Sequence, residues 1–415
     1  MRMGLDRIAG PAGHVFRGTA VALGASIPVS TALDNVLIVV AWAAAALSGQ
    51  LHDYVKLLFK IKYLQFCLLL FGLLALGTFY GDNSAREAFS TLGKYADLLC
   101  IPVFAIAFRE RDTRMRALYA FAITIAVVVV LSYLMRFGLL PQWPVFTGNT
   151  ASPTVFKLKI THNIFVAFGA FLFAWLGSTS ENPRVQLTWF TLSLLAALNV
   201  LLLVQGATGY LTLGVLILLL GRERIGRRGT IYAVLALATV VAVLVSTPNA
   251  FRDRVLVIAQ EVQQWRAQGV STTSAGSRLE FYANTLDIIA AHPLTGVGTG
   301  GFPNAYARQV QGSGKVETRN PHNEFLHIAA QIGIIGLVVL MVMYWQQWRS
   351  AKFLDSPMEQ ALARGLVLTM VSGCMVNSLL LDHAEGLFYA WLSGLLLGGL
   401  KYGMLNPPTN PLTLK

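Results

Sequence analysis

Long apolar runs separated by short polar segments recur along the whole chain of 415 residues. Most of the runs approach the roughly 20 apolar residues that a helix needs to cross a bilayer. The short alternating segments of a membrane barrel do not occur. The pattern predicts an all-α polytopic membrane protein with about 12 transmembrane helices. Their predicted cores are Thr19–Pro28, Thr31–Leu47, Tyr63–Tyr80, Leu92–Phe108, Ala117–Leu139, Ile160–Gly177, Gln186–Val204, Leu211–Leu220, Ile231–Val245, Phe325–Trp345, Ala361–Leu380 and Leu387–Tyr402.

One long polar segment interrupts this pattern late in the chain. It divides the protein into transmembrane helices one to nine over residues 1–245, a polar loop over 246–321, and transmembrane helices ten to twelve over 322–415. The loop is expected to be helical, with an amphipathic spacing over Ala250–Trp265. A capping-box pattern, Ser277-Arg-Leu-Glu280, predicts the start of a second helix that runs to Ile289 and is stopped by Pro293. The glycine-rich run Gly296–Gly301 is expected to form a tight turn.

Charge indicates how the chain is oriented. Lys and Arg gather in alternate short loops, for example Arg109–Arg116 and Arg222–Arg228, and such loops face the cytoplasm. Both termini are then cytoplasmic and the long loop is periplasmic. The basic start, Met1 to Arg17, is interpreted as part of an uncleaved first helix. The net charge of +12 is largely explained by the cytoplasmic loops, so nucleic acid binding is not expected.

His322 is the strongest candidate for a catalytic base. It follows Pro321, a residue favoured in the first turn of a helix, and precedes the apolar run that begins at Phe325. The positive field of a helix N-terminus disfavours imidazolium, so His322 is expected to stay neutral, as a general base must. Asn323 is expected to orient the site. The alternative is that His322 only caps a helix at the membrane interface.

Several cations share the predicted periplasmic side with His322. Guanidinium groups match phosphate oxygens bidentately, which favours Arg254, Arg278 and Arg319 as ligands of an anion. Lys159 and His162 begin the sixth span, and the lysine runs against the charge rule. The alternatives are a solvated surface for the arginines and interfacial snorkelling for Lys159. No Asp-x-Asp pair, paired zinc-ligand spacing or Walker loop occurs, so neither a metal nor a cofactor is expected.

These motifs resemble one known family. The pattern His322-Asn323 followed by Gly333-x-x-Gly336, together with Ser277-Arg278 and the segment Pro293–Phe302, resembles the O-antigen ligase branch of the O-antigen ligase/polymerase superfamily. The resemblance implies a GT-C-like transferase of the bacterial inner membrane. It would move a glycan from undecaprenyl diphosphate to an acceptor at the periplasmic face. Ligases use a sugar of lipid A–core, polymerases use another carrier-linked glycan, and related oligosaccharyltransferases use a protein.

The resemblance also assigns roles to residues. It places the family's essential histidine at His322, its loop arginine at Arg278 and its late acidic residue at Asp382. This chain departs from the family in the loop after the seventh span, Gln205–Gly209, which has no arginine. Lys159, Arg254 or Gln205 is expected to compensate.

The expected reaction is inverting and metal-independent. Its partners are the carrier-linked O-antigen, lipid A–core and membrane lipid. A polytopic transporter of lipid-linked glycans is the alternative from another class of protein. It is disfavoured because the ionisable residues gather at one face and not in mid-membrane.

Overall fold

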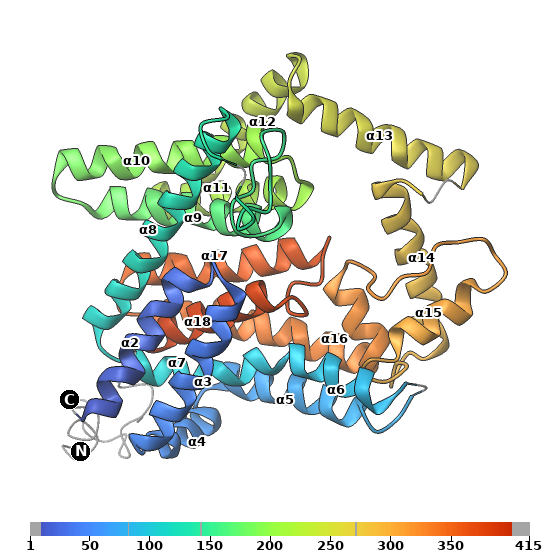
Figure 1. Cartoon of the computed structure of the whole chain (residues 1–415), viewed down its shortest axis with the longest axis horizontal. Coiled ribbons are helices and arrows are strands. Elements are labelled where there is room, and N and C mark those ends of the chain that lie inside the picture. Colours follow the sequence, from blue (N-terminus) through green and yellow to red (C-terminus); the bar gives the residue numbers. More distant parts are fainter. Residues whose placement is uncertain (1–9, 82, 142, 270–271, 401–415) are drawn as a thin grey trace.

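The computed structural model describes residues 10–81, 83–141, 143–269 and 272–400. Within these ranges the chain is all-helical, with no strand, so the predicted all-α class is confirmed (Figure 1). The α-helices are α2 (Pro11–Ser26), α3 (Thr31–Leu47), α4 (Leu51–Lys60), α5 (Lys62–Gly77), α6 (Ala85–Lys94), α7 (Ile101–Ala107), α8 (Arg111–Arg136), α9 (Lys159–Thr179), α10 (Pro183–Leu198), α11 (Ala207–Ile225), α12 (Arg227–Ser246), α13 (Ala250–Gln268), α14 (Ser274–Ala291), α15 (Phe302–Val310), α16 (Glu324–Ser350), α17 (Pro357–Cys374) and α18 (His383–Leu397).

Each predicted apolar run overlaps a helix, but fewer helices are long and apolar enough to cross a membrane alone. Among the described residues five meet that test: α8, α9, α10 with its π-helical extension to Leu203, α12, and α16 with the short turn after it. Two bent pairs, α3 with α4 and α6 with the segment Ala96–Ala107, raise the number to at most seven. The chain is therefore a membrane protein, while the twelve crossings, the GT-C-like arrangement and the three-part division remain predictions. The last predicted run extends to Tyr402, beyond the described residues.

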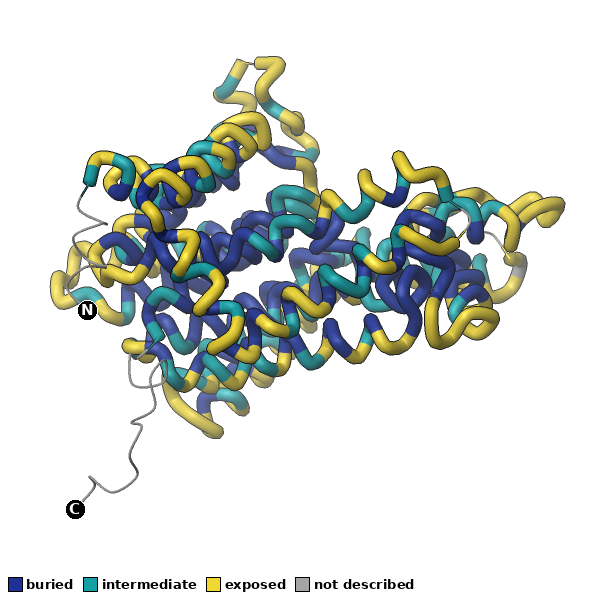
Figure 2. The backbone as a smooth tube through the Cα atoms, turned by 90° about the horizontal axis from the view of Figure 1, so that it is seen from below, coloured by how far each residue is buried: buried dark blue, intermediate teal, exposed yellow. Residues whose placement is uncertain are grey.

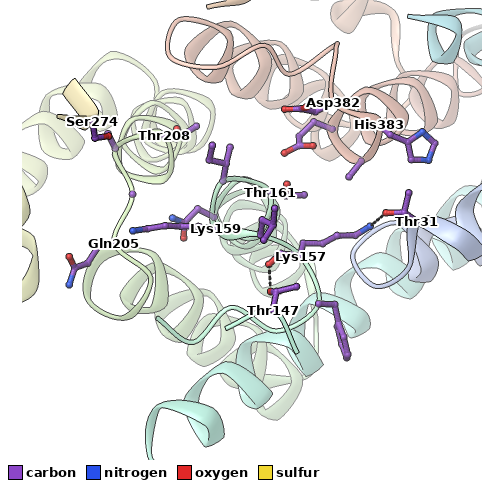
Figure 3. Close-up of a pocket in the computed structure, with 18 of the residues that line it drawn as sticks. Thr31, Thr147, Lys157, Lys159, Thr161, Gln205, Thr208, Ser274, Asp382 and His383 are labelled. Carbon is purple, nitrogen blue, oxygen red and sulfur yellow. Dashed lines mark hydrogen bonds between the residues drawn. The ribbon is translucent and has the colours of Figure 1, made fainter. Parts of the chain in front are cut away.

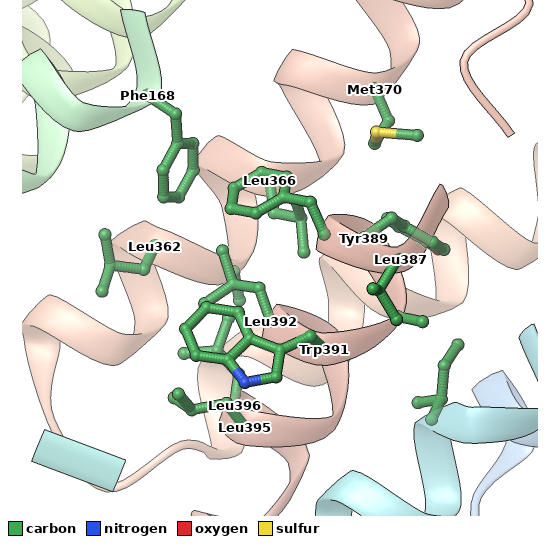
Figure 4. Close-up of a cluster of buried hydrophobic side chains, with 14 of the residues drawn as sticks. Phe168, Leu362, Leu366, Met370, Leu387, Tyr389, Trp391, Leu392, Leu395 and Leu396 are labelled. Carbon is green, nitrogen blue, oxygen red and sulfur yellow. The ribbon is translucent and has the colours of Figure 1, made fainter. Parts of the chain in front are cut away.

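Two helices form the centre of the molecule. Buried residues run through its middle, and exposed ones lie outside (Figure 2). Helix α9 is buried from His162 to Gly177, and α18 is buried from Glu385 to Leu397. A helix that is apolar all round is stable only when neighbours cover every face. Figure 4 shows side chains of α17 and α18 packed together, with Phe168 of α9 beside Leu366. The Phe168 ring also packs against that of Phe388 on α18, with 5.3 Å between the ring centroids. The N-terminal end of α18 is thereby held in a fixed place, which matters for the site below.

Helix α16 contains the Gly333-x-x-Gly336 pattern and is broken at its first glycine. Helix α16 loses helical geometry at Ile332 and Gly333, where Gly333 has φ +71° and ψ −175°. The segment after α14 is hydrogen-bonded to this break. Val297 N donates to Ala330 O (2.8 Å), and Ile334 N donates to Pro293 O (2.8 Å). The predicted tight turn is therefore a close junction between the loop and α16, and it satisfies backbone groups that the break frees.

We expect Gly333→Ala to destabilise the protein strongly. Only glycine adopts this backbone conformation readily, and a side chain there costs about 1–3 kcal/mol. An added Cβ would also overlap the Leu294 carbonyl oxygen. Gly226→Ala is a matched control, because Gly226 has a similar conformation (φ +69°, ψ −145°) but open space around it. The thermal midpoint in detergent should fall clearly further for the Gly333 variant. Equal falls would show that the junction contributes nothing beyond backbone strain.

Candidate active site

Five helices begin at one cavity. The cavity has a volume of about 690 Å³. Its wall includes the first turns of α3, α9, α11, α14 and α18, at Thr31, Lys159, Ala207, Ser274 and His383 (Figure 3). The α9, α11 and α18 N-termini have no side-chain cap. Their free N–H groups and the positive ends of the helix dipoles therefore favour an anion.

Four cationic side chains line the same cavity: Lys157, Lys159, Arg254 and Arg278. Lys157 donates to Thr31 Oγ1 (2.9 Å) and lies 3.9 Å from the Asp34 carboxylate, so its charge is partly used within the protein. The other three form no ion pair with any carboxylate in the part of the chain that the structure describes. They are available to a ligand. The cavity also has an apolar side, made by Phe156, Leu158 and Ile160.

Arg254 is positioned by a ring contact. The Asn249 side chain caps α13 by accepting from Phe251 N (2.9 Å) and Arg252 N (3.1 Å). Phe251 is buried, and its ring packs 4.8 Å from that of Tyr210 on α11. Arg254 lies about one helical turn further along α13. The predicted helix over Ala250–Trp265 is thus confirmed, and its start is held against the cavity.

Arg278 lies in the second turn of α14, which differs from the prediction at its start. The cap is Thr273, whose side chain accepts from Gly276 N (3.2 Å), and Ser277 lies inside the helix. The capping-box interpretation of Ser277 was therefore wrong, because an earlier Thr offers a better-placed hydroxyl. Trp265 Nε1 donates to Glu280 Oε2 (3.0 Å), which fastens α14 to α13. Both arginine-bearing helices are thereby joined.

His322 lies beside Arg278, just before α16. Its ring stacks on Phe281 of α14 at 6.1 Å and 26°, and its backbone N donates to Asn320 Oδ1 (2.8 Å). Burial and the nearby positive charge of Arg278 lower the pKa of His322. The imidazole is therefore neutral near pH 7, as expected. The main cause is desolvation, not the helix field invoked from the sequence.

The backbone of His322 is unusual. It has φ +56°, the only positive φ at a non-glycine residue in the described part of the chain. Left-handed residues of this kind often mark functional positions. Pro321 does not begin α16 as predicted. The helix begins at Glu324, and Asn323 caps it by accepting from Leu326 N (3.1 Å).

Asn323 and its neighbour tie this segment to the rest of the site. Asn323 Nδ2 donates to Met375 O at the end of α17 (3.0 Å). Glu324 is fully buried and accepts from Tyr95 Oη (2.8 Å) and Leu380 N (3.0 Å). Leu380 immediately precedes the segment that holds Asp382, which lines the cavity. Burial raises the pKa of Asp382, and the positive charge of Lys94 opposes this effect.

One family model matches part of this chain. Residues 191–341, from within α10 to within α16, match the family model described as O-antigen ligase. Over this segment the chain is similar to the O-antigen ligase family. The matched segment holds Arg254, Arg278 and His322, whereas Lys159 and Asp382 lie outside it. No curated protein matches the chain.

Most of the predicted site residues lie at or beside the first cavity. Lys159, Gln205, Arg254, Arg278 and Asp382 line the cavity, and His322 adjoins it through Arg278. The loop that lacks the family's arginine, at Gln205–Thr208, lies in the wall. Arg254 from α13 lines the same cavity, and its role in place of that arginine stays a prediction.

Two predicted diphosphate ligands lie elsewhere. His162 is buried inside the helix bundle and does not line the cavity. Its Nε2 lies 3.1 Å from Asn199 Oδ1 in the π-helical turn, and Asn199 Nδ2 donates to Ser132 Oγ (2.8 Å). Arg319 pairs with Glu87 (3.3 Å) and lines a separate cavity. Neither residue lines the first cavity, because His162 points into the helix bundle and Arg319 pairs with α6.

Sequence reasoning missed a histidine–aspartate pair. His383 lines the cavity, and its Nδ1 lies 3.7 Å from Asp97 Oδ2. Asp97 falls inside the predicted apolar run Leu92–Phe108, where an ionisable residue is costly and tends to be functional. That signal was available in the sequence. The pairing of Asp97 with His383 could not be predicted, since the two residues are far apart in the chain.

Proposed function

We propose that the protein is an inverting, metal-independent glycosyltransferase, a lipopolysaccharide O-antigen ligase. It would transfer O-antigen polysaccharide from undecaprenyl diphosphate to a sugar hydroxyl of lipid A–core. The enzyme would lie in the bacterial inner membrane, with both termini cytoplasmic and its active site periplasmic. The observation that carries the proposal is the convergence of five helix N-termini and four cations on one cavity with an apolar side. A diphosphate on a lipid is the ligand that such a cavity fits best.

The donor's diphosphate would bind to Arg278, Arg254 and Lys159. Gln205 and the uncapped α9, α11 and α18 N-termini would supply further hydrogen bonds. The carrier chain would enter sideways from the membrane along Phe156, Leu158 and Ile160. These groups would stabilise the negative charge that develops on the leaving diphosphate, an electrostatic contribution often made by a metal ion.

The acceptor hydroxyl would be activated by His322. Neutral His322 would take the hydroxyl proton while the acceptor oxygen bonds to the anomeric carbon of the donor. The bond between that carbon and the phosphate oxygen would break, and its electron pair would leave with the carrier diphosphate. A single displacement inverts the anomeric centre. Asn323 and Asp382 would position the histidine and the reacting sugars.

Transfer by the purified protein tests this function. The chain in lipid nanodiscs would be given carrier-linked O-antigen with lipid A–core, a second carrier-linked glycan, or an acceptor protein. We expect product on lipid A–core only, with an inverted linkage by NMR. Product on the carrier would identify a polymerase, and product on the protein an oligosaccharyltransferase. Movement of donor across vesicles without any new glycosidic bond would indicate a transporter.

Transfer should survive excess EDTA. No group of three or more His, Cys, Asp or Glu side chains within the described residues is arranged to hold a metal ion. Three unpaired cations in the cavity instead face the proposed diphosphate. The initial rate with EDTA should therefore match the rate with added Mg²⁺ or Mn²⁺. A loss in EDTA that either ion restores would overturn the arginine-based account.

A further inference from the structure

A second cavity lies next to the first and has a different character. Its volume is about 510 Å³. Charged groups and hydroxyls make most of its wall, unlike the partly apolar wall of the first cavity. The lining residues of α6 and the turn before it are Ser84, Arg86, Glu87, Ser90, Thr91 and Lys94. Arg319, Gly300, Pro303, His327 and Leu381 complete the wall.

Two cations in this second cavity are free to bind a ligand. Arg86 and Lys94 are exposed, and neither forms an ion pair with a carboxylate among the described residues. Glu87 is the one acidic residue of the wall. It is already engaged by Arg319 and by the cap of α6, where its side chain accepts from Ser84 Oγ (3.0 Å). The cations of the wall therefore outnumber its one carboxylate, and the nearby Asp382 carboxylate offsets part of the charge of Lys94.

A buried histidine in this wall has a ring nitrogen without a hydrogen bond. His327 is 3% exposed, and its Nδ1 has no hydrogen-bond partner among the described residues. A buried polar atom without a partner is costly, by about 1–3 kcal/mol, unless a ligand or water satisfies it. His327 is held by an edge contact with Phe302 at 5.4 Å. His327 therefore adds a buried imidazole to the wall of the second cavity.

Two short segments join the second cavity to the first. Leu381 lines the second cavity and Asp382, the next residue, lines the first. Arg319 lines the second cavity, and three residues later His322 lies beside Arg278 of the first. His322 lines neither cavity, but it lies near Arg278 of the first and near His327 of the second.

We propose that the second cavity binds the acceptor, through phosphate or carboxylate groups on its sugars that Arg86 and Lys94 recognise. This inference rests on the proposed transferase function and extends it to a second substrate site. The mostly polar wall suits a sugar headgroup, whereas the carrier lipid needs the apolar side of the first cavity. The serine and threonine hydroxyls of α6 would hydrogen-bond sugar hydroxyls.

Acceptor binding without donor tests the proposal, because no transfer occurs in that assay. The probe is purified lipid A–core added to the full chain in nanodiscs. Arg86→Gln/Lys94→Gln should weaken binding by about tenfold or more, since each lost charge-assisted hydrogen bond costs on the order of a factor of ten. Arg86→Lys/Lys94→Arg should retain most of the affinity. Arg111→Gln/Arg116→Gln, an exposed pair at the start of α8, removes the same charge and should bind normally.

Two modified probes identify the recognised group. Lipid A–core without its phosphates, or with its carboxylates reduced, should lose affinity for the unmodified chain when the relevant anion is missing. The Arg86/Lys94 double glutamine variant should then bind that probe as well as the unmodified chain does. Unchanged affinity of the variant, or equal losses on intact and modified probes, would overturn the proposal. So would a defect in binding undecaprenyl diphosphate alone.

The outcomes separate this inference from the proposed function. Normal transfer to lipid A–core with no change in acceptor affinity in the double variant leaves the function intact and overturns the second site. Tight, Arg86/Lys94-dependent binding of lipid A–core without any transfer supports the second site and overturns the ligase.

Discussion

Replacing His322 with alanine should reduce glycan transfer by about a hundredfold or more while leaving the fold intact. Loss of a general base has an effect of this size. The side chain is only half-buried and stacks on one ring, Phe281, so its removal should cost little stability. Single-turnover rates with saturating donor and acceptor measure the effect. His52→Ala, at an exposed histidine of α4, is the control.

The pH profile gives a finer test of the same residue. Burial and Arg278 lower the pKa of His322, so the neutral base should persist below the ordinary range of histidine. The rate of the unmodified enzyme should therefore fall only at acidic pH. Arg278→Gln removes a positive charge that lowers this pKa, so the acid limb of its residual activity should move to higher pH. An unmoved limb, or near-normal turnover by His322→Ala, would remove His322 from the role of base.

Arg278→Lys should lose most of the transfer activity, by about tenfold to a hundredfold. Lysine keeps the charge but cannot form the fork-shaped pair of hydrogen bonds that a guanidinium makes with phosphate oxygens. Hydrogen bonds to charged groups contribute about 1.5–3 kcal/mol, which sets the range. Arg278 is fixed on α14 through the Thr273 cap and the Trp265–Glu280 bond, so the shorter head group of lysine would be poorly placed.

Binding of undecaprenyl diphosphate separates the ways in which Arg278 could act. Both Arg278→Lys and Arg278→Ala should bind the carrier more weakly, and the alanine variant should be at least as impaired. Arg266→Lys, on the exposed part of α13, should behave normally. Full transfer by Arg278→Lys would show that bidentate recognition is wrong. Normal carrier binding by both variants would assign the residue to the acceptor or to loop structure.

The fold class followed from the sequence because apolar runs of membrane length admit few other structures. Every run overlaps a helix, and α3 matches its prediction at both ends. The lengths of the helices were less predictable than their positions. Helix α11 has 19 residues, whereas the predicted core was Leu211–Leu220. Its polar first turn, Ala207–Tyr210, packs at the cavity, and tertiary contacts there extend a helix that hydropathy alone cuts short.

The candidate site was predictable in its residues but not in its geometry. His322 stood out at the mouth of an apolar helix and Arg278 as a guanidinium in the long loop, and the family resemblance pointed to both and to Asp382. That helices far apart in the chain begin at one cavity cannot be derived from spacing, since it depends on how the helices pack. The same limit explains His162, which has the polarity of a ligand but is turned into the bundle toward Asn199.

The uncapped helix ends at the first cavity have a consequence for turnover. In the proposed reaction the spent carrier diphosphate gains a terminal phosphate oxygen, and so more negative charge than the donor's diester. A cavity that attracts anions through α9, α11 and α18 would hold this product more tightly than the substrate. Release of the carrier, not glycosidic bond formation, would then limit the steady rate, as in many enzymes. A rapid burst followed by slow turnover is the expected time course. The slow phase should persist when a phosphatase consumes the free carrier diphosphate, because dissociation of the bound product is the limiting step.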